Sequence, residues 1–254
     1  MRRIATVALV AVATVVVAAT AAEPRTAQAA APYSPRVQVM VVGRMRLLKA
    51  PTFVYSRPFS LLLGRRRCAV AGGTPLAALE GARRLGGPSF HVRDYGGCSL
   101  RFADASAMYV DRVGLDYARG RDGWVYKVDR RVGTTSAADL SGPFGSGRRL
   151  RAGQRVTWFY CRMGLAGCQR TLELGAPVRR VAAGSALGVH VHAYDDLARG
   201  RSAAGATVTL AGARFVADAG GNVTVTAPAQ PGRHLLYASQ PGSIQAVPVE
   251  ITVT

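Results

Sequence analysis

Four cysteines are the residues whose chemistry the sequence constrains most: Cys68, Cys98, Cys161 and Cys168. Their even number predicts two disulfides in an oxidising compartment. Three pairings are possible, and we favour Cys68–Cys98 and Cys161–Cys168. Cys161 ends a strand-like run and Cys168 opens the next, so this second bridge would pin a hairpin. A metal site is disfavoured because neither pair has C-x-x-C spacing or a histidine beside it.

Two aromatic residues, Trp124 and Tyr126, alternate along one predicted strand and therefore share a face. The simplest interpretation is packing in a core or against a sheet. The alternative is a stacking surface for a flat ligand. On that second interpretation Trp124 and Tyr126 are the candidate ligand-binding residues.

A pair of histidines, His190 and His192, also shares a strand face, with Asp195 and Asp196 just beyond. A metal site needs three or four convergent ligands, and His234 would have to come from a neighbouring strand. Histidines on an exposed face are the favoured interpretation. The aspartates lack the dense loop of oxygen ligands that calcium prefers, so no metal site is predicted.

Recognisable catalytic patterns are missing from the sequence. It has no G-x-S-x-G serine, no H-E-x-x-H, no Walker A loop and no Rossmann fingerprint. Cysteines used in disulfides leave no thiol nucleophile, and no pair of acidic residues stands out as a general acid and base. We therefore predict no catalytic residues and no enzymatic activity.

The N-terminus has the pattern of a secretory signal peptide over residues 1–29. Met1–Arg3 is positively charged, Ile4–Ala19 is an uncharged apolar run, and small-x-small sites follow at Ala19–Ala21 and Ala27–Ala29. An uncleaved anchor is the less favoured alternative, because the run is short for a membrane span. Nothing after residue 30 is long and apolar enough to cross a bilayer, so the cleaved protein is not predicted to be an integral membrane protein.

The 254-residue chain is strongly basic: 33 Lys+Arg stand against 14 Asp+Glu, a formal net charge of +19. This charge is spread along the chain, and its local clusters are Arg65–Arg67 and Arg148–Arg151. Most of it is expected to be solvated surface. The functional interpretation is attraction to anionic wall polymers or lipid headgroups. Export argues against nucleic acid as the partner.

Residue patterning predicts a mostly β protein whose first domain, of α+β type, covers residues 37–175 after a flexible lead-in over 30–36. One helix is expected, with Thr74 as its N-cap, Pro75 at its first position and Gly86 at its end. The expected strands of this domain are 37–42, 52–63, 89–95, 107–113, 123–128 and 155–161.

Beyond a boundary near Gly175–Pro177 the cysteines end and short strands recur at the spacing of a β-sandwich. The second domain is therefore expected to cover residues 178–254. Its expected strands are 187–194, 206–210, 214–217, 222–226, 232–239 and 246–253.

Four segments of the first domain resemble the transcobalamin-like C-terminal domain, a β-grasp-like family of exported bacterial proteins. They are Gly73–Glu80, Tyr109–Val113, Gly123–Asp129 and Leu150–Trp158. The third resembles Gly-Trp-x-Tyr-x-Val-Asn and the fourth Leu-x-x-Gly-Asp-x-Val-x-Trp. Asp129 stands where Asn is usual and Gln154 where Asp is common, both at turns. The resemblance covers residues 37–174 and implies a β-grasp with one helix.

The second domain is similar to bacterial Ig-like or carboxypeptidase-regulatory-like modules. The segments that carry this likeness are Gly205–Val208 and Asp218–Thr224. Many sandwiches share these patterns, so the likeness implies an Ig-like β-sandwich and no particular ligand.

Together these features predict a secreted, non-catalytic binding or adhesion protein of the bacterial cell envelope, with a wall polymer or an extracellular protein as partner. The Ig-like module would act as a spacer or a second contact. The alternative is capture of a corrinoid or another small ligand by the β-grasp domain, because the resemblance implies that this domain covers one face of cobalamin. Transcobalamin completes its site with a helical barrel that this chain lacks. No cofactor is predicted outside that alternative, and an unrecognised extracellular enzyme is the least favoured interpretation.

Overall fold

The computed structural model describes residues 32–254, whose regular structure is mostly β-strand. The predicted signal peptide, residues 1–29, lies outside the described residues. From residue 32 onward, every helix is too short or too polar to cross a membrane.

The first part of the chain contains ten strands, one α-helix and a short 3₁₀ helix at Phe102–Ala105. Its strands are β1 (Arg36–Val42), β2 (Leu47–Tyr55), β3 (Phe59–Leu63), β4 (Arg66–Val70), β5 (Phe90–Asp94), β6 (Met108–Val113), β7 (Asp116–Tyr117), β8 (Gly123–Val128), β9 (Arg131–Val132) and β10 (Arg155–Cys161). The helix α1 spans Pro75–Arg84. The patterning missed β4, because this strand begins with two arginines.

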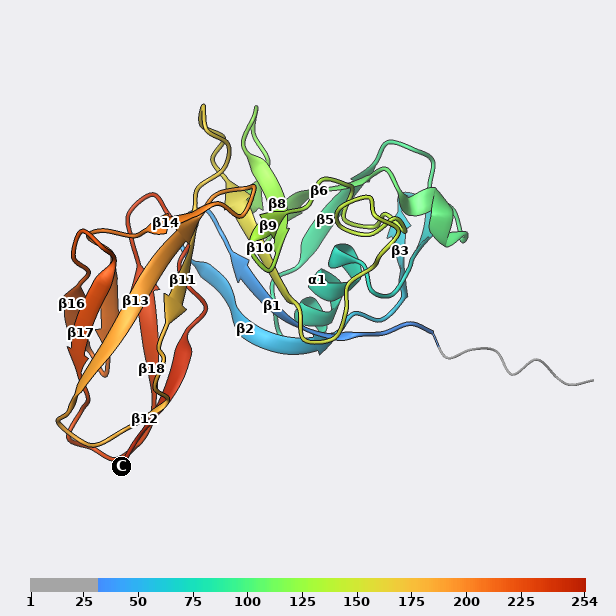
Figure 1. Ribbon diagram of the computed structural model, residues 1–254. Coiled ribbons are helices and arrows are strands. Elements are labelled where there is room, and N and C mark those ends of the chain that lie inside the picture. The colour runs from blue at the N-terminus through green and yellow to red at the C-terminus, as the bar shows by residue number, and fades with distance from the viewer. Residues whose placement is uncertain (1–31) are drawn as a thin grey trace, which may run out of the picture. The chain divides into compact units, whose positions relative to one another are not determined.

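The main sheet has the strand order β2-β1-β10-β8-β9. Strand β1 runs parallel to β10, and the other neighbouring pairs are antiparallel. Helix α1, which follows the first strands, packs against β1, β2 and β10 (Figure 1). A mixed sheet with parallel central strands and one covering helix is the β-grasp arrangement that the sequence predicts.

Helix α1 forms where its end signals predicted it. The Oγ1 of Thr74 accepts a hydrogen bond from the N–H of Ala77 at 3.2 Å, which satisfies one of the free donors of the first turn. Pro75 opens the helix, and Gly86 follows its C-cap with a φ of 77°. Its apolar face, which includes Leu76 and Leu79, is buried in the core.

Smaller elements surround the main sheet: a hairpin of β3 and β4, and a sheet with the order β5-β6-β7. The disulfide Cys68–Cys98, with a Cα–Cα distance of 5.4 Å, joins β4 to the segment after β5. Both cysteines are buried in the core of this domain, and the predicted pairing is confirmed.

The described part of the expected flexible lead-in is held against the domain. The hydroxyl of Tyr33 donates a hydrogen bond to the carbonyl of Leu150 at 2.6 Å, and the Arg149 guanidinium lies 4.6 Å from the Tyr33 ring centroid. The carbonyl of Pro35 accepts from the N–H of Ser56, and β1 already begins at Arg36. Residues 32–36 therefore have defined partners in the first domain.

The second part is a β-sandwich of two sheets. Its strands are β11 (Thr171–Gly175), β12 (Arg180–Val181), β13 (Ala186–Tyr194), β14 (Gly200–Ser202), β15 (Thr207–Leu210), β16 (Ala213–Val216), β17 (Asn222–Thr226), β18 (Gly232–Ser239) and β19 (Val249–Val253). One sheet has the order β11-β13-β14, with β17 also paired to β13, and the other has the order β12-β19-β18-β15-β16. Alternating apolar residues of both sheets meet in one core.

Because of strand β11, the boundary between the two domains lies earlier in the chain than expected. It pairs with β13, and Leu172 and Leu174 are buried in the core of the sandwich. The sandwich therefore begins at Thr171, ahead of the boundary predicted at Gly175–Pro177. This strand could not be assigned to the sandwich from local patterns, because β11 directly follows the last cysteine-containing segment of the first domain.

The two departures from the transcobalamin-like motifs contact each other: Asp129 lies in the turn between β8 and β9, and Gln154 directly precedes β10. Asp129 has a φ of 55°, a left-handed conformation that Asn and Asp tolerate better than other non-glycine residues. Its carboxylate accepts hydrogen bonds from the N–H of Arg155 at 3.0 Å and from Nε2 of Gln154 at 3.2 Å. In turn, Oε1 of Gln154 accepts from the N–H of Arg151 at 2.8 Å.

Two substitutions of Asp129 should separate its tolerance of the left-handed conformation from its role as a hydrogen-bond acceptor. We expect Asp129→Ala to destabilise the protein by about 1–2 kcal/mol, because it removes both acceptors and leaves a strained left-handed residue. Asp129→Asn keeps the tolerance of this conformation and one acceptor oxygen, so it should cost less than about 1 kcal/mol. Urea unfolding of both variants measures the difference, and equal losses would contradict this account of the turn.

Candidate functional site

Trp124 and Tyr126 lie on β8 and face the core of the first domain, where they are 2% and 5% exposed. The indole N–H of Trp124 donates to the carbonyl of Asp116 at 2.8 Å, and the hydroxyl of Tyr126 donates to the carbonyl of Thr135 at 2.9 Å. The Tyr126 ring packs against Trp158, with centroids 5.3 Å apart. Neither ring offers an open face for stacking a ligand.

A small cavity of 150 Å³ remains beside these two rings. Sites for small molecules usually measure about 300–1,000 Å³. A corrinoid, which is far larger than this cavity, does not fit between the two side chains as they lie. Gly133 contributes to the tight packing, since a Cβ atom there would lie 2.1 Å from the Tyr126 ring. Core packing, the simpler of the two interpretations, therefore accounts for both residues.

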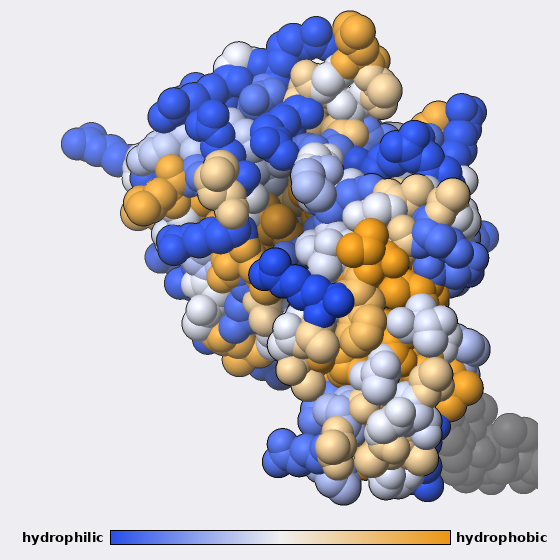
Figure 2. All heavy atoms as spheres, turned by 90° about the vertical axis from the view of Figure 1, so that its left-hand side faces the viewer, coloured by the Kyte–Doolittle hydropathy of each residue, from blue (hydrophilic) through white to orange (hydrophobic). Residues whose placement is uncertain are grey.

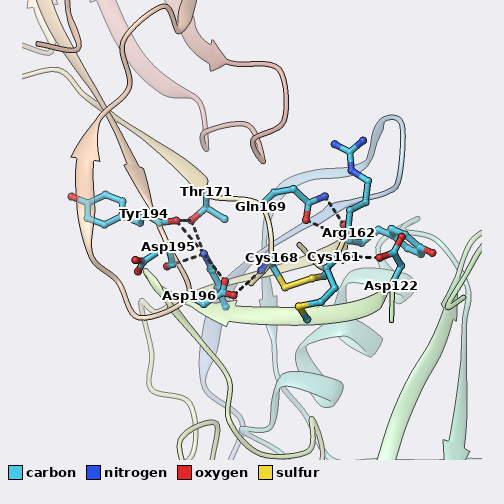
Figure 3. The surroundings of a disulfide bond; sticks show 12 residues. Asp122, Cys161, Arg162, Cys168, Gln169, Thr171, Tyr194, Asp195 and Asp196 are labelled. Carbon is cyan, nitrogen blue, oxygen red and sulfur yellow. Dashed lines mark hydrogen bonds and ion pairs between the residues drawn. A yellow bond between two sulfur atoms is a disulfide. The ribbon is translucent and has the colours of Figure 1, made fainter. Parts of the chain in front are cut away.

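The disulfide Cys161–Cys168 forms as predicted, with a Cα–Cα distance of 5.1 Å, but it does not pin a hairpin. Cys161 ends β10 of the main sheet, and the strand after Cys168 is β11 of the sandwich. Figure 3 shows the bridge and its surroundings. The bridge closes the connection between the two domains, because the strands on either side belong to different sheets.

Lys127 is the charged side chain that links the two domains most directly. It extends from β8, and its side chain is 0% exposed. Its Nζ donates to the carbonyls of Asp195 at 3.0 Å and Tyr194 at 3.2 Å and to Oγ1 of Thr171 at 3.4 Å, and it lies 3.4 Å from a carboxylate oxygen of Asp196. Burial lowers the pKa of Lys127, while Asp196 acts in the opposite direction.

Further contacts surround this buried ammonium group. Arg130 binds the carboxylate of Glu173 with two nitrogen atoms, and its hydrogen bonds lower the pKa of Glu173. An apolar cluster joins Met40, Phe159 and Ile244 from both domains. We call this contact region between the two domains the junction. It has an apolar part, formed by Met40, Phe159 and Ile244, and a polar part, in which the charges of Lys127 and Arg130 have partners.

The histidines and aspartates of β13 and its following turn do not converge on a metal position. The rings of His190 and His192 stack with centroids 4.0 Å apart, and Nε2 of His190 lies 2.9 Å from the carbonyl of Gly220. Asp195 accepts from backbone N–H groups of its own turn, and Asp196 accepts from the N–H of Cys168. Residues 32–254 contain no group of three His, Cys, Asp or Glu side chains that could hold a metal ion.

In each of the two basic clusters, Arg65–Arg67 and Arg148–Arg151, one arginine contacts another part of the first domain. In the first, Arg66 lies 3.6 Å from the carboxylate of Asp94. In the second, Arg149 donates to the carbonyl of Gly72. Figure 2 shows hydrophilic side chains projecting from one face of the molecule, with hydrophobic residues gathered in patches between them. On that face the hydrophilic side chains are spread over the surface and do not gather into one patch.

A groove that residue patterning does not predict, here called the aromatic groove, lies along the edge strand β2 next to α1 and measures 580 Å³. Phe53 and Tyr55 line it and are 49% and 51% exposed, although they are large aromatic residues. Arg36 lies 4.6 Å from the Phe53 ring centroid, and Arg57 lies 5.2 Å from that of Tyr55. The groove therefore contains two half-exposed rings, each with a guanidinium group over one of its faces.

Strand register explains why these rings are exposed. Val54 faces the core, so Phe53 and Tyr55 on either side of it point to the opposite face of the sheet. On that face Tyr55 is opposite Arg36 of β1. The signal in the sequence was the alternation Phe53-Val54-Tyr55, which shows that the aromatics share a face but not that this face is open.

The helical wall of the groove is held close to β2 and carries a fixed charge arrangement. A Cβ atom at Gly81 would lie 3.0 Å from the carbonyl oxygen of Tyr55, so a larger residue there would require β2 to shift by a few tenths of an ångström. Glu80 accepts hydrogen bonds from Arg83 and Arg84. Burial acts to raise the pKa of Glu80, but these bonds outweigh it and hold that pKa below its ordinary value.

A larger groove of 670 Å³ lies between the β3–β4 hairpin and β5, and the disulfide residue Cys98 also lines it. Its lining includes Arg65, Arg66, His91 and Asp94 but no Phe, Tyr or Trp side chain. The aromatic groove is therefore the better candidate for binding a ligand through ring stacking.

Comparison with known proteins assigns no family. No protein-family model matches the chain, and a search of curated proteins finds no match. Among solved structures, the D00–D0 domain of intimin is 13% identical over 65% of this chain and 78% of its own, with a TM-score of 0.27. The fibronectin(III)-like modules of Clostridium thermocellum CbhA are 12% identical over 51% and 75%, with a TM-score of 0.25.

A third structure is SGBP-B of the Bacteroides ovatus mixed-linkage glucan utilization locus, solved in complex with a mixed-linkage heptasaccharide. It is 13% identical over 84% of this chain and 42% of its own, with a TM-score of 0.23. At such low TM-scores these likenesses support no conclusion about this chain, so its function has to be argued from its own residues.

Removing the buried charge of Lys127 should weaken the whole unit. We expect Lys127→Met to lower the free energy of unfolding by about 3–5 kcal/mol, because Asp196 and the carbonyl oxygens lose their partner in a buried place. The matched control is Lys49→Met at the other lysine of the chain, which lies near the surface and should change stability by less than about 1 kcal/mol. Equal effects in urea unfolding would show that the junction does not depend on Lys127.

Burial of Tyr126 predicts a loss of stability at high pH. Desolvation raises its pKa in the folded protein to about 12, whereas the unfolded chain releases the phenol proton near its ordinary value of 10. The unfolded state is therefore favoured as the pH rises above 10. Between pH 9 and pH 11, the stability advantage of the wild type over Tyr126→Phe should shrink by about 1.4 kcal/mol. Urea unfolding at the two pH values measures this change, and a constant difference would contradict it.

Proposed function

We propose that this protein is an exported, non-catalytic binding protein of the bacterial cell envelope that holds an acidic polysaccharide in the aromatic groove. The observation that carries the proposal is the pair of half-exposed rings, Phe53 and Tyr55, two residues apart on an edge strand. Contiguous exposed apolar surface of this kind is typical of interaction sites.

The spacing of the rings suits a repeating chain. Residues two apart on a strand are separated by about 6.5–7 Å, so two rings can contact successive parts of an extended polymer. The apolar face of a sugar ring packs on an aromatic face, and its hydroxyl groups stay hydrated. Arg36 and Arg57 lie over one face of these rings and add positive charge to the groove, which favours sugars that carry carboxylate groups.

The disulfides support a place outside the cytoplasm. All four cysteines are paired, one bridge inside the first domain and one at the junction. Such bridges persist in oxidising compartments, and the predicted signal peptide over residues 1–29 agrees with export. Outside the cytoplasm, wall polymers are more accessible partners than nucleic acid.

We also infer that the first domain is of the transcobalamin-like β-grasp type. The strand order β2-β1-β10-β8-β9 with one helix supports this inference, as does the turn at Asp129 and Gln154, which preserves the motif's turn chemistry with different side chains. The inference concerns common ancestry. It does not extend to corrinoid binding, because Trp124 and Tyr126 are core residues.

Removing both rings tests the proposed binding without changing the charge. We expect the double variant Phe53→Ala, Tyr55→Ala to bind immobilised polygalacturonate at least about tenfold more weakly than the wild type at 0.15 M NaCl, because two stacking contacts are lost. Dextran, a neutral polymer, should bind more weakly than polygalacturonate to the wild type.

The matched control is Tyr237→Ala, which removes a ring exposed to a similar degree on β18 of the sandwich. Its affinity for polygalacturonate should stay within about twofold of the wild type. All three proteins carry the same charge, so attraction of a basic protein to a polyanion is equal among them. Equal binding by all three, or no binding by the wild type, would overturn the proposal.

A further inference from the structure

Two neighbouring loops present an exposed surface that is separate from the aromatic groove. We call it the tip surface and define it by Arg119 and Arg121 of the loop before β8, and by Arg162, Met163 and Leu165 of the loop after β10. All five residues are exposed, and Leu165 is exposed completely. Figure 1 shows these two loops projecting in the same direction beyond β8 and β10.

Strand register and a direct contact place the two loops together. Gly123, the first residue of β8, is opposite Cys161, the last residue of β10, so both loops leave the same end of the sheet. The N–H of Met163 donates to the carboxylate of Asp122 at 2.9 Å, a contact that Figure 3 also shows around the disulfide. The tip surface is therefore one continuous feature.

Covalent and hydrogen bonds hold Leu165 away from the protein. The disulfide Cys161–Cys168 closes the base of its loop. Above the base, Gly164 and Gly167 exchange two backbone hydrogen bonds, of 2.9 and 3.4 Å, which leaves Leu165 at the apex of a tight turn. A leucine that could fold back would gain by burying its side chain, and this loop prevents it. The backbone that presents this side chain is thus already ordered, so binding costs little further backbone entropy.

The charge around this leucine is positive. Arg119, Arg121 and Arg162 belong to the same two loops as this leucine. The two carboxylates that contact these loops, Asp122 and Asp196, already accept hydrogen bonds from the N–H groups of Met163 and Cys168. A polysaccharide would pair with the arginines but leave Leu165 in water. A bilayer with anionic headgroups accepts both parts, because guanidinium groups pair with phosphates while an apolar tip enters the boundary of the acyl chains.

We propose that the tip surface docks the protein peripherally on a membrane that contains anionic phospholipid. Leu165 enters the interface, and the three arginines bind lipid phosphates. This contact is independent of the aromatic groove, so the failure of one proposal leaves the other standing.

Vesicle co-sedimentation tests the proposal with the exported protein, all variants sharing one N-terminus. At 0.15 M NaCl the wild type should bind vesicles of equal parts phosphatidylglycerol and phosphatidylcholine, and bind pure phosphatidylcholine at least about tenfold more weakly. Replacing the three arginines by glutamine should reduce binding to the mixed vesicles at least about tenfold, since each arginine contributes about fivefold. Leu165→Ser should reduce it about fivefold or more.

The matched control is Leu115→Ser, which removes a strongly exposed leucine from the β6–β7 turn and should leave binding within about twofold. A second readout reports insertion directly. With Leu165→Trp, the tryptophan emission should shift to shorter wavelength on mixed vesicles, whereas Leu115→Trp should show no shift. These substitutions are at exposed positions, so unchanged thermal unfolding is expected for each.

Three outcomes would overturn the proposal. One is equal loss of binding in L165S and L115S. Another is vesicle binding by the wild type without an emission shift in L165W, which would indicate attraction by charge alone. The third is no preference for phosphatidylglycerol over phosphatidylcholine.

Discussion

An ammonium group removed from water needs acceptors on every side, and the junction of this protein is built around that requirement. Lys127 extends from the main sheet of the first domain, while all of its acceptors, from Thr171 to Asp196, belong to the sandwich. Neither domain alone satisfies this charge, because its loss of hydration is offset only when both are present. The apolar contacts of Met40 and Phe159 with Ile244 then exclude water from the same place.

The disulfide Cys161–Cys168 has two consequences that follow from its position between the sheets. It limits the separation of β10 and β11, so the strand that carries Thr171 stays near Lys127. It also closes the loop that exposes Leu165, so one bond supports both the junction and the tip surface. The second disulfide, Cys68–Cys98, acts within the core of the first domain and has no such outward effect.

The β-grasp sheet is used differently on its two faces. Helix α1 covers one face, where Val37 and Val54 are buried. The other face packs against the sandwich around Phe159 and Lys127, and at β2 it leaves Phe53 and Tyr55 open. Alternation along each strand is what allows one sheet to serve a core, a junction and a candidate binding groove. The proposed polysaccharide contact thus lies at the sheet edge that neither the helix nor the sandwich fully covers.

Local sequence determined the elements with strong signals: the helix from Thr74 to Gly86, the strand Gly123–Val128, the alternating strands of the sandwich and the favoured pairing of the cysteines. These depend on caps, period-2 patterns and spacing, which a chain carries within a few residues. Only the tertiary structure decided that β11 belongs to the sandwich, that Trp124 is buried while Phe53 is open, and that Lys127 is enclosed. An aromatic on a strand looks the same in sequence on either face, because its exposure depends on which distant segment packs above it.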